Sequence, residues 1–133
     1  MASYFNEIEF ILYVSDQERS TKFYSEILEM EAVLNVPGMT EFRLSENVKL
    51  GLMPEAGIVK ILENKITNPA AANGISRCEL YLKTDDIQKK YRFLIQKGIE
   101  ILKNPAEMNW GDTVFYLSDP DGHIIAFAQQ TKN

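Results

Sequence analysis

Two glutamates, Glu9 and Glu79, begin two similar stretches of this sequence. Residues 9–16 read EFILYVSD and residues 79–86 read ELYLKTDD. The shared residues recur 70 positions apart in three pairs: Glu9 and Glu79, Asp16 and Asp86, Phe23 and Phe93. One supersecondary unit used twice would produce this spacing, and it would place the two glutamates at equivalent points facing one shared site. Two carboxylates in one site can act as general bases or hold a hard divalent cation.

Few other residues offer nucleophilic or metal chemistry. His123 is the single histidine, and from its place after a turn no Ser–His–Asp or Cys–His set can be assembled. Cys78 is the single cysteine, which excludes an internal disulfide framework and a cysteine-cluster zinc site. It lies on the helix-facing side of its predicted strand, where we expect an inert core thiol.

The chain is acidic and of ordinary globular composition. It has 133 residues, a net charge of −5 and 45% hydrophobic residues. We expect no nucleic-acid binding, because such binding needs clustered lysine and arginine. No apolar run approaches the roughly 18 residues of a membrane span, and the N-terminal stretch lacks the basic and apolar regions of a signal peptide. We therefore expect a cytoplasmic protein without membrane contact.

The element that carries the first glutamate is a predicted strand. Residues 7–14 alternate in character, with Glu9 on one side. The other side, which should face a helix, is made by Phe10, Leu12 and Val14. Ser15 and Glu18 have the spacing of a capping box and predict a helix through about Leu28. Three further strands are predicted at residues 30–36, 39–45 and 48–53.

The second glutamate has the same predicted setting. A strand is expected over residues 77–84 and a helix over about 86–97, with Asp85 as its cap and Gln88 at the capping-box position. The helix-facing side of this strand is made by Cys78, Leu80 and Leu82. Further strands are predicted at residues 99–103, 112–118 and 123–129. The sequence DPDG at 119–122 is typical of a turn between the last two.

Each half of the chain therefore reads as strand–helix–strand–strand–strand. We expect residues 1–133 to form a single domain, with a first module over about 5–53 and a second over about 76–130. Residues 54–75 connect the modules. A connection of this length is either a partly helical lid or a mobile linker.

Two longer stretches carry a family resemblance. Residues 12–30 read LYVSDQERSTKFYSEILEM, and residues 109–129 read NWGDTVFYLSDPDGHIIAFAQ. Both, together with the internal repeat, resemble the vicinal-oxygen-chelate superfamily, which includes glyoxalase I, extradiol dioxygenases and the bleomycin-resistance proteins. The resemblance implies an α+β fold of two βαβββ modules that form a cup-shaped mixed sheet, the glyoxalase/bleomycin-resistance/dioxygenase fold. This scaffold hosts enzymes and binding proteins alike, so the fold does not decide the function.

In this superfamily, the resemblance implies, catalytic members bind one divalent metal through four strand positions. The matching positions here are Glu9, Gly51, Glu79 and Ala126. Glycine and alanine offer no donor atom, and a catalytic centre needs about three protein ligands plus an open position. We therefore expect no tightly bound metal and no cofactor, although a weakly held Mg²⁺ or Ca²⁺ remains open.

Alternation along the strands predicts the lining of the cup. The expected ligand-binding residues are Glu9, Tyr13, Arg43, Lys49, Met53, Glu79, Tyr81 and Trp110. The small residues Gly51, Ala126 and Ala128 should leave room in the cup floor. An alternative is that Glu9 and Glu79 pair with Lys49 and Lys83 as a structural network, because buried charges are usually paired.

These features predict a metal-independent protein that binds a small molecule, sequestering an amphipathic or cationic compound in an acidic, aromatic site. The alternative is an enzyme, a glyoxalase-type lyase or isomerase or a dioxygenase-like protein, that uses Glu9 or Glu79 as a base or metal ligand. A third hypothesis is a structural or regulatory dimer with an empty cup. The resemblance also implies a twofold homodimer.

Overall fold

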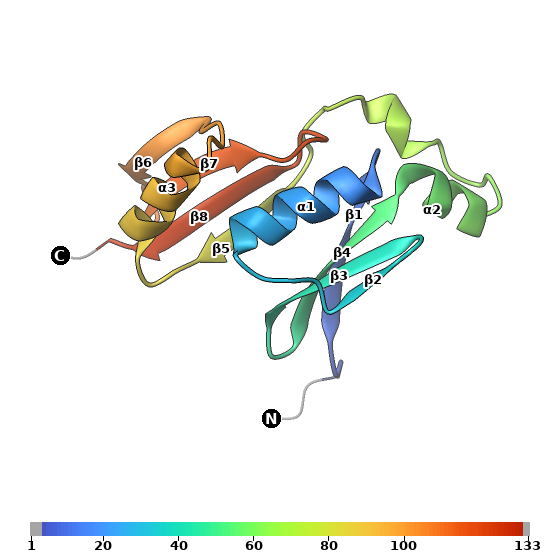
Figure 1. The fold of residues 1–133 in the computed structure, drawn as a ribbon, viewed down its shortest axis with the longest axis horizontal. Coiled ribbons are helices and arrows are strands. Elements are labelled where there is room, and N and C mark those ends of the chain that lie inside the picture. Colours follow the sequence, from blue (N-terminus) through green and yellow to red (C-terminus); the bar gives the residue numbers. More distant parts are fainter. Residues whose placement is uncertain (1–3, 132–133) are drawn as a thin grey trace. The chain divides into compact units, whose positions relative to one another are not determined.

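The computed structural model describes residues 4–131 (Figure 1). Its contacts divide the chain into two compact units, residues 1–73 and 74–133. The single-domain organisation stays a prediction. Within the described range, no helix combines the length and the apolar character that crossing a membrane requires. The cytoplasmic location also stays a prediction.

The first unit is a four-stranded mixed sheet with a helix against it. Its strand order is β1-β4-β3-β2, in which β1 and β4 are parallel and the other neighbours are antiparallel. The strands are β1 (Ile8–Val14), β2 (Leu34–Val36), β3 (Met39–Ser45) and β4 (Val48–Pro54). The helices are α1 (Gln17–Leu28), α2 (Glu55–Ile61) and the short 3-10 helix η1 (Pro69–Ala72). The connector is therefore partly helical.

The second unit repeats this topology. Its strand order is β5-β8-β7-β6, again with one parallel pair, β5 and β8. The elements are β5 (Glu79–Lys83), α3 (Ile87–Gln96), β6 (Lys103–Glu107), β7 (Asp112–Ser118) and β8 (Ile124–Gln130). The two mixed sheets, each built as βαβββ, confirm the α+β fold predicted from the repeat.

Each sheet has one apolar face covered by its helix. In the first unit the buried side chains of α1, β3 and β4 are Tyr24, Ile27, Phe42, Leu50 and Leu52. In the second unit those of α3, β7 and β8 are Ile87, Leu94, Phe115, Leu117, Ile125 and Phe127. Burying one such side chain stabilises a fold by about 1.5–3 kcal/mol. These faces hold the sheets rigid, so that the opposite faces can carry polar groups in fixed positions.

Two predictions of burial on the helix-facing side are wrong. Phe10 is 62% exposed, because β1 is an edge strand and α1 packs on the inner strands β3 and β4. Cys78 is also exposed, because β5 begins only at Glu79 and the thiol lies in the connection before it. Val14, at the other end of β1, is buried as predicted.

The strand predicted at residues 99–103 lies four residues later, at Lys103–Glu107. Pro105 falls inside it, and proline cannot donate to a strand ladder. The strand tolerates Pro105 because β6 is at the edge of its sheet, and its pairing with β7 shifts register between Lys103 and Ala106.

The repeated aspartates are the caps of the two main helices. Asp16 accepts a hydrogen bond from the backbone N–H of Arg19 at 3.0 Å, and Asp86 accepts one from that of Lys89 at 3.0 Å. The capping-box pattern had pointed to Ser15 and Asp85 as the caps, and that prediction is wrong. The aspartate at the end of each repeated stretch thus fixes where the following helix begins.

Replacing either cap should cost a similar amount of stability. We expect Asp16→Ala and Asp86→Ala each to lower the free energy of unfolding by about 1 kcal/mol, because each leaves a helix N–H without its acceptor. Urea unfolding followed by circular dichroism measures the change. Asp85→Ala is the matched control, since it removes a neighbouring carboxylate but leaves the cap. An equal loss in this control would contradict the assignment.

Candidate ligand-binding site

The helix-free face of the first sheet carries a charged cluster. Lys49, on the inner strand β4, pairs with Glu9 on β1 and with Arg43 on β3. Glu41, also on β3, pairs with Gly51. The Lys49 Nζ lies 3.0 Å from Glu41 Oε1 and 3.9 Å from Glu9 Oε1. Arg43 binds Glu7 at 2.8 Å. Because these charges neutralise each other in pairs, the face is polar without a large net charge.

The pKa values of Glu9 and Glu41 shift in opposite directions. Burial, and then the hydrogen bond with Glu41, raise the pKa of Glu9 above its ordinary value. The hydrogen bond from Glu9, together with Lys49, lowers the pKa of Glu41. Glu9 Oε2 is buried and has no hydrogen-bond partner, which would be costly for an ionised carboxylate. A proton on Glu9 lowers this cost, because a neutral carboxyl is less costly to bury than a carboxylate, and the raised pKa has this cause.

This assignment predicts the pH dependence of stability. A carboxyl with a raised pKa binds more protons in the folded state, so its contribution is complete below the ordinary value of 4.5 and is lost as pH rises. Wild type should therefore lose stability relative to Glu9→Gln between pH 4.5 and the pKa of folded Glu9. Urea unfolding across this range measures it.

Glu41 supplies the matched comparison for that prediction. Its pKa is lowered, so its contribution is present above 4.5 and is lost as pH falls. The difference in free energy of unfolding between wild type and Glu41→Gln should therefore change below pH 4.5. Parallel pH profiles of the free energy of unfolding for wild type and Glu9→Gln would contradict the raised pKa of Glu9.

Gly51 does not leave an empty space. A Cβ atom at this position would collide with Glu9 Oε2 and would lie 3.1 Å from the Ile11 side chain. The carboxylate of Glu9 thus fills the room that the missing side chain provides. Tyr13 and Met53 are register partners on the same face, and both are partly buried.

The corresponding face of the second sheet is apolar at its centre. Ala126, Ala128 and Val114 are fully buried there. The side chains that cover them are Tyr81, Met108 and Tyr116. The prediction that the two alanines leave a hollow is therefore wrong, because aromatic rings fill it.

One indole is held at the edge of this face by a chain of hydrogen bonds. The Trp110 Nε1–H donates to the Tyr81 hydroxyl at 2.9 Å, and that hydroxyl donates to Asp112 Oδ2 at 2.6 Å. Lys83 Nζ lies 3.5 Å from Asp112 Oδ1. Burial, and then the hydrogen bond to Asp112, raise the pKa of Tyr81. Trp110 as a whole is 61% exposed.

The predicted site residues thus fall into two groups. The first unit brings together Glu9, Arg43 and Lys49, and the second joins Tyr81 to Trp110. Glu79 is exposed at the start of β5, and its charge contributes, after burial, to a raised pKa of Tyr116. The structural-network alternative holds in part, since Glu9 pairs with Lys49 but Lys83 pairs with Asp112.

Besides Glu7, two residues of these clusters were missed in the sequence, Glu41 and Asp112. The signal was present, because alternation along β3 sets Glu41 on the side of Arg43, and alternation along β7 sets Asp112 on the side of Val114. Neither residue is marked by the repeat, however.

The family metal positions do not fit a metal ion in this chain. Glu9 already lies against Lys49 and Glu41, Gly51 offers no donor, and Ala126 is buried under aromatic rings. Across residues 4–131, no group of three or more histidine, cysteine, aspartate or glutamate side chains is arranged to hold an ion.

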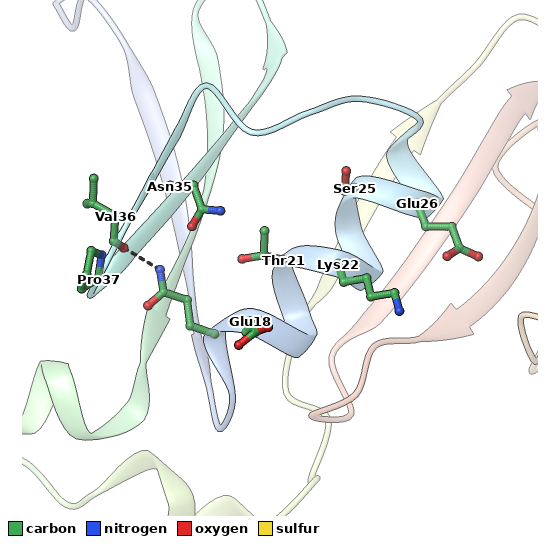
Figure 2. A pocket seen from close by; sticks show the side chains of 9 residues that line it. Glu18, Thr21, Lys22, Ser25, Glu26, Asn35, Val36 and Pro37 are labelled. Carbon is green, nitrogen blue, oxygen red and sulfur yellow. Dashed lines mark hydrogen bonds between the residues drawn. The ribbon is translucent and has the colours of Figure 1, made fainter.

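A separate hollow of about 780 Å³ lies in the first unit between α1 and β2 (Figure 2). Most of the residues that line it have polar side chains: Gln17, Glu18, Thr21, Lys22, Ser25, Glu26, Asn35, Val36 and Pro37. The Gln17 amide spans its end by donating to the Val36 carbonyl at 2.8 Å and to Thr40 Oγ1 at 2.9 Å. None of the residues predicted to bind ligand lines this hollow.

Comparisons with known proteins point in one direction. Residues 7–131 match the profile of the glyoxalase-like domain. The phenazine antibiotic resistance protein EhpR of Enterobacter agglomerans is 32% identical over 123 residues, which cover 86% of this chain and 84% of that protein.

Solved structures of similar fold agree. A glyoxalase/bleomycin resistance protein/dioxygenase from Nocardioides aligns with a TM-score of 0.82 at 20% identity, covering 100% of this chain and 88% of that one. A lactoylglutathione lyase from Agrobacterium tumefaciens aligns with a TM-score of 0.73 at 19% identity, covering 92% and 91%. At these identities the likeness shows the fold.

Proposed function

Because this chain belongs to the glyoxalase-like domain family of the vicinal-oxygen-chelate superfamily, we propose that it binds and sequesters a planar aromatic small molecule. The ligand is amphipathic or cationic, and no metal takes part. Trp110 supplies the surface on which the ligand stacks.

The exposed and fixed indole of Trp110 carries this proposal. Its one polar group is bonded to Tyr81, while 61% of the residue faces solvent. An indole face attracts planar rings and cations. The relative's name supports the same ligand class, because a phenazine is a planar tricyclic heteroaromatic.

Metal independence rests on the donor set. Two of the four family positions carry no donor atom, and Lys49 supplies a positive charge beside Glu9 at 3.9 Å. Elemental analysis after dialysis against a chelator should find well below one equivalent of transition metal per chain. One tightly held equivalent would contradict this part of the proposal.

One ring system in three charge states tests the binding function. The probes are N-methylphenazinium, phenazine and phenazine-1-carboxylate, each titrated against the fluorescence of the single tryptophan. We expect saturable quenching, tightest for the cation because the protein is acidic. Preference for the anion would exclude the cationic class, and an absence of saturable quenching by all three would refute the proposal.

The raised pKa of Glu9 favours a second candidate, a glyoxalase-type lyase or isomerase. A carboxyl with a raised pKa is suited to removing a proton next to a carbonyl. Solvent-deuterium exchange into the hemithioacetal of methylglyoxal and glutathione would reveal it. The exchange should be absent in Glu9→Gln, and no exchange with wild type would exclude this candidate.

We also propose a twofold homodimer, the commonest closed assembly. Sedimentation velocity at tens of micromolar should give about twice the chain mass of 15.2 kDa. A single 15.2 kDa species at that concentration would contradict the dimer.

A further inference from the structure

We infer that Asp112, acting through Tyr81, is a positioning residue that locks the plane of Trp110, so that the site selects electron-poor planar heteroaromatics by ring face alone. The inference rests on the proposed ligand-binding function. It gives Asp112 and Tyr81 a role in positioning Trp110, and it narrows the ligand class from planar aromatics to electron-poor heteroaromatics.

The chemistry of the groups fixes the direction of every hydrogen bond in this chain. An indole N–H can only donate, so the Tyr81 oxygen accepts at 2.9 Å. The Tyr81 hydroxyl then has its own proton to give, and Asp112 Oδ2 receives it at 2.6 Å. Asp112 is buried, and Lys83 at 3.5 Å balances its charge. While the Asp112 carboxylate is ionised, no member of this hydrogen-bond chain can exchange its donor and acceptor roles.

The backbone around Trp110 is fixed as well. Gly111 follows it with a φ of +95°, a conformation that favours glycine. The turn is closed by two hydrogen bonds, from Gly111 N–H to the Met108 carbonyl at 3.1 Å and from Met108 N–H to the Asp112 carbonyl at 2.8 Å. With both the turn and the ring held, a ligand need not order the indole when it binds, which removes part of the entropic cost.

The same bonds limit what the ring can recognise. The N–H of Trp110 and the O–H of Tyr81 are both donated inside the protein, so neither proton is available to a ligand. Contact with the indole therefore comes through its π-face. A hydrogen-bond chain that ends on a carboxylate polarises its members and leaves the indole richer in electrons. Such a face favours rings depleted of electrons by nitrogen atoms or positive charge.

Tyr81→Phe and Asp112→Asn test the chain, with Tyr116→Phe as the matched control. Tyr116 lies on the same face and covers the same alanines, but it takes no part in the Trp110–Tyr81–Asp112 chain. The single tryptophan gives one indole N–H resonance, whose chemical shift and exchange with solvent report its hydrogen bond without any ligand. Tyr81→Phe should move this resonance and speed its exchange, and Asp112→Asn should move it less because the amide oxygen can still accept. Tyr116→Phe should leave it in place.

Binding of N-methylphenazinium is measured on the same variants. Tyr81→Phe should weaken it about fivefold, the equivalent of one hydrogen bond of about 1 kcal/mol, and Tyr116→Phe should leave it unchanged. An unmoved N–H resonance in Tyr81→Phe overturns the hydrogen-bond chain. A moved resonance with unchanged affinity overturns the positioning role alone and leaves the proposed function standing. Failure of wild type to bind any probe refutes the proposed function, and the positioning role with it.

Discussion

Replacing Trp110 by alanine should weaken the binding of N-methylphenazinium by about 1–3 kcal/mol, the loss typical of a central aromatic anchor. Trp110 is 61% exposed, so removing its side chain costs little packing within the unit. Nearly all of the effect should therefore appear in affinity and little in the free energy of unfolding. Isothermal titration calorimetry measures the change, because this variant has no tryptophan to quench.

Trp110→Phe separates the two contributions of the indole. Phenylalanine keeps a stacking face but cannot donate to Tyr81, so its affinity should fall between those of wild type and Trp110→Ala. Equal affinity in all three proteins would show that the ligand binds elsewhere, and the polar hollow between α1 and β2 would become the candidate.

Replacing Gly122 by alanine should lower the free energy of unfolding by about 2–3 kcal/mol. Gly122 has a φ of +90°, which disfavours any residue with a Cβ. In addition, a Cβ there would collide with the backbone carbonyl oxygen of Gly74 and lie 3.0 Å from the Gly74 carbonyl carbon. Because backbone atoms obstruct it, the collision cannot be relieved by turning a side chain.

Gly98→Ala is the matched control for this prediction. Gly98 has a φ of +78°, but a Cβ there would meet nothing within 4 Å. Gly98→Ala should lower the free energy of unfolding by about 1 kcal/mol, the cost of placing a residue with a Cβ at a positive φ. Urea unfolding of both variants measures the difference, and equal losses would show that Gly122 is not crowded by Gly74.

The hydrogen bonds of the turn at residues 119–122 explain why the sequence predicts it. Asp119 Oδ1 accepts from the backbone N–H groups of Asp121 and His123 at 2.9 and 2.8 Å, and its Oδ2 lies 2.8 Å from His123 Nδ1. All of these contacts join residues within four positions of each other. The turn can be predicted from sequence because these contacts are local, whereas its contacts with Gly74 and Ser76 cannot.

The sequence by itself determined the repeated βαβββ architecture and the start of each main helix. The pairs at a 70-residue offset, Asp16 with Asp86 among them, depend on strand alternation and capping, which act over a few residues. The family resemblance followed from the same local motifs. The one strand predicted out of place, at residues 99–103, lies at Lys103–Glu107 and contains Pro105 at the sheet edge.

Only the tertiary structure decided which side chains share a site. Glu41 reaches Glu9 and Lys49, and Asp112 reaches Tyr81, because strands distant in the sequence lie side by side in a particular register. Alternation tells which side of a strand a residue occupies but not which neighbour it meets. The same pairing placed Glu9 over Gly51 and aromatic rings over Ala126, and so filled the space that small residues had suggested was open. Packing fills such gaps because an interior left empty loses contacts on every side.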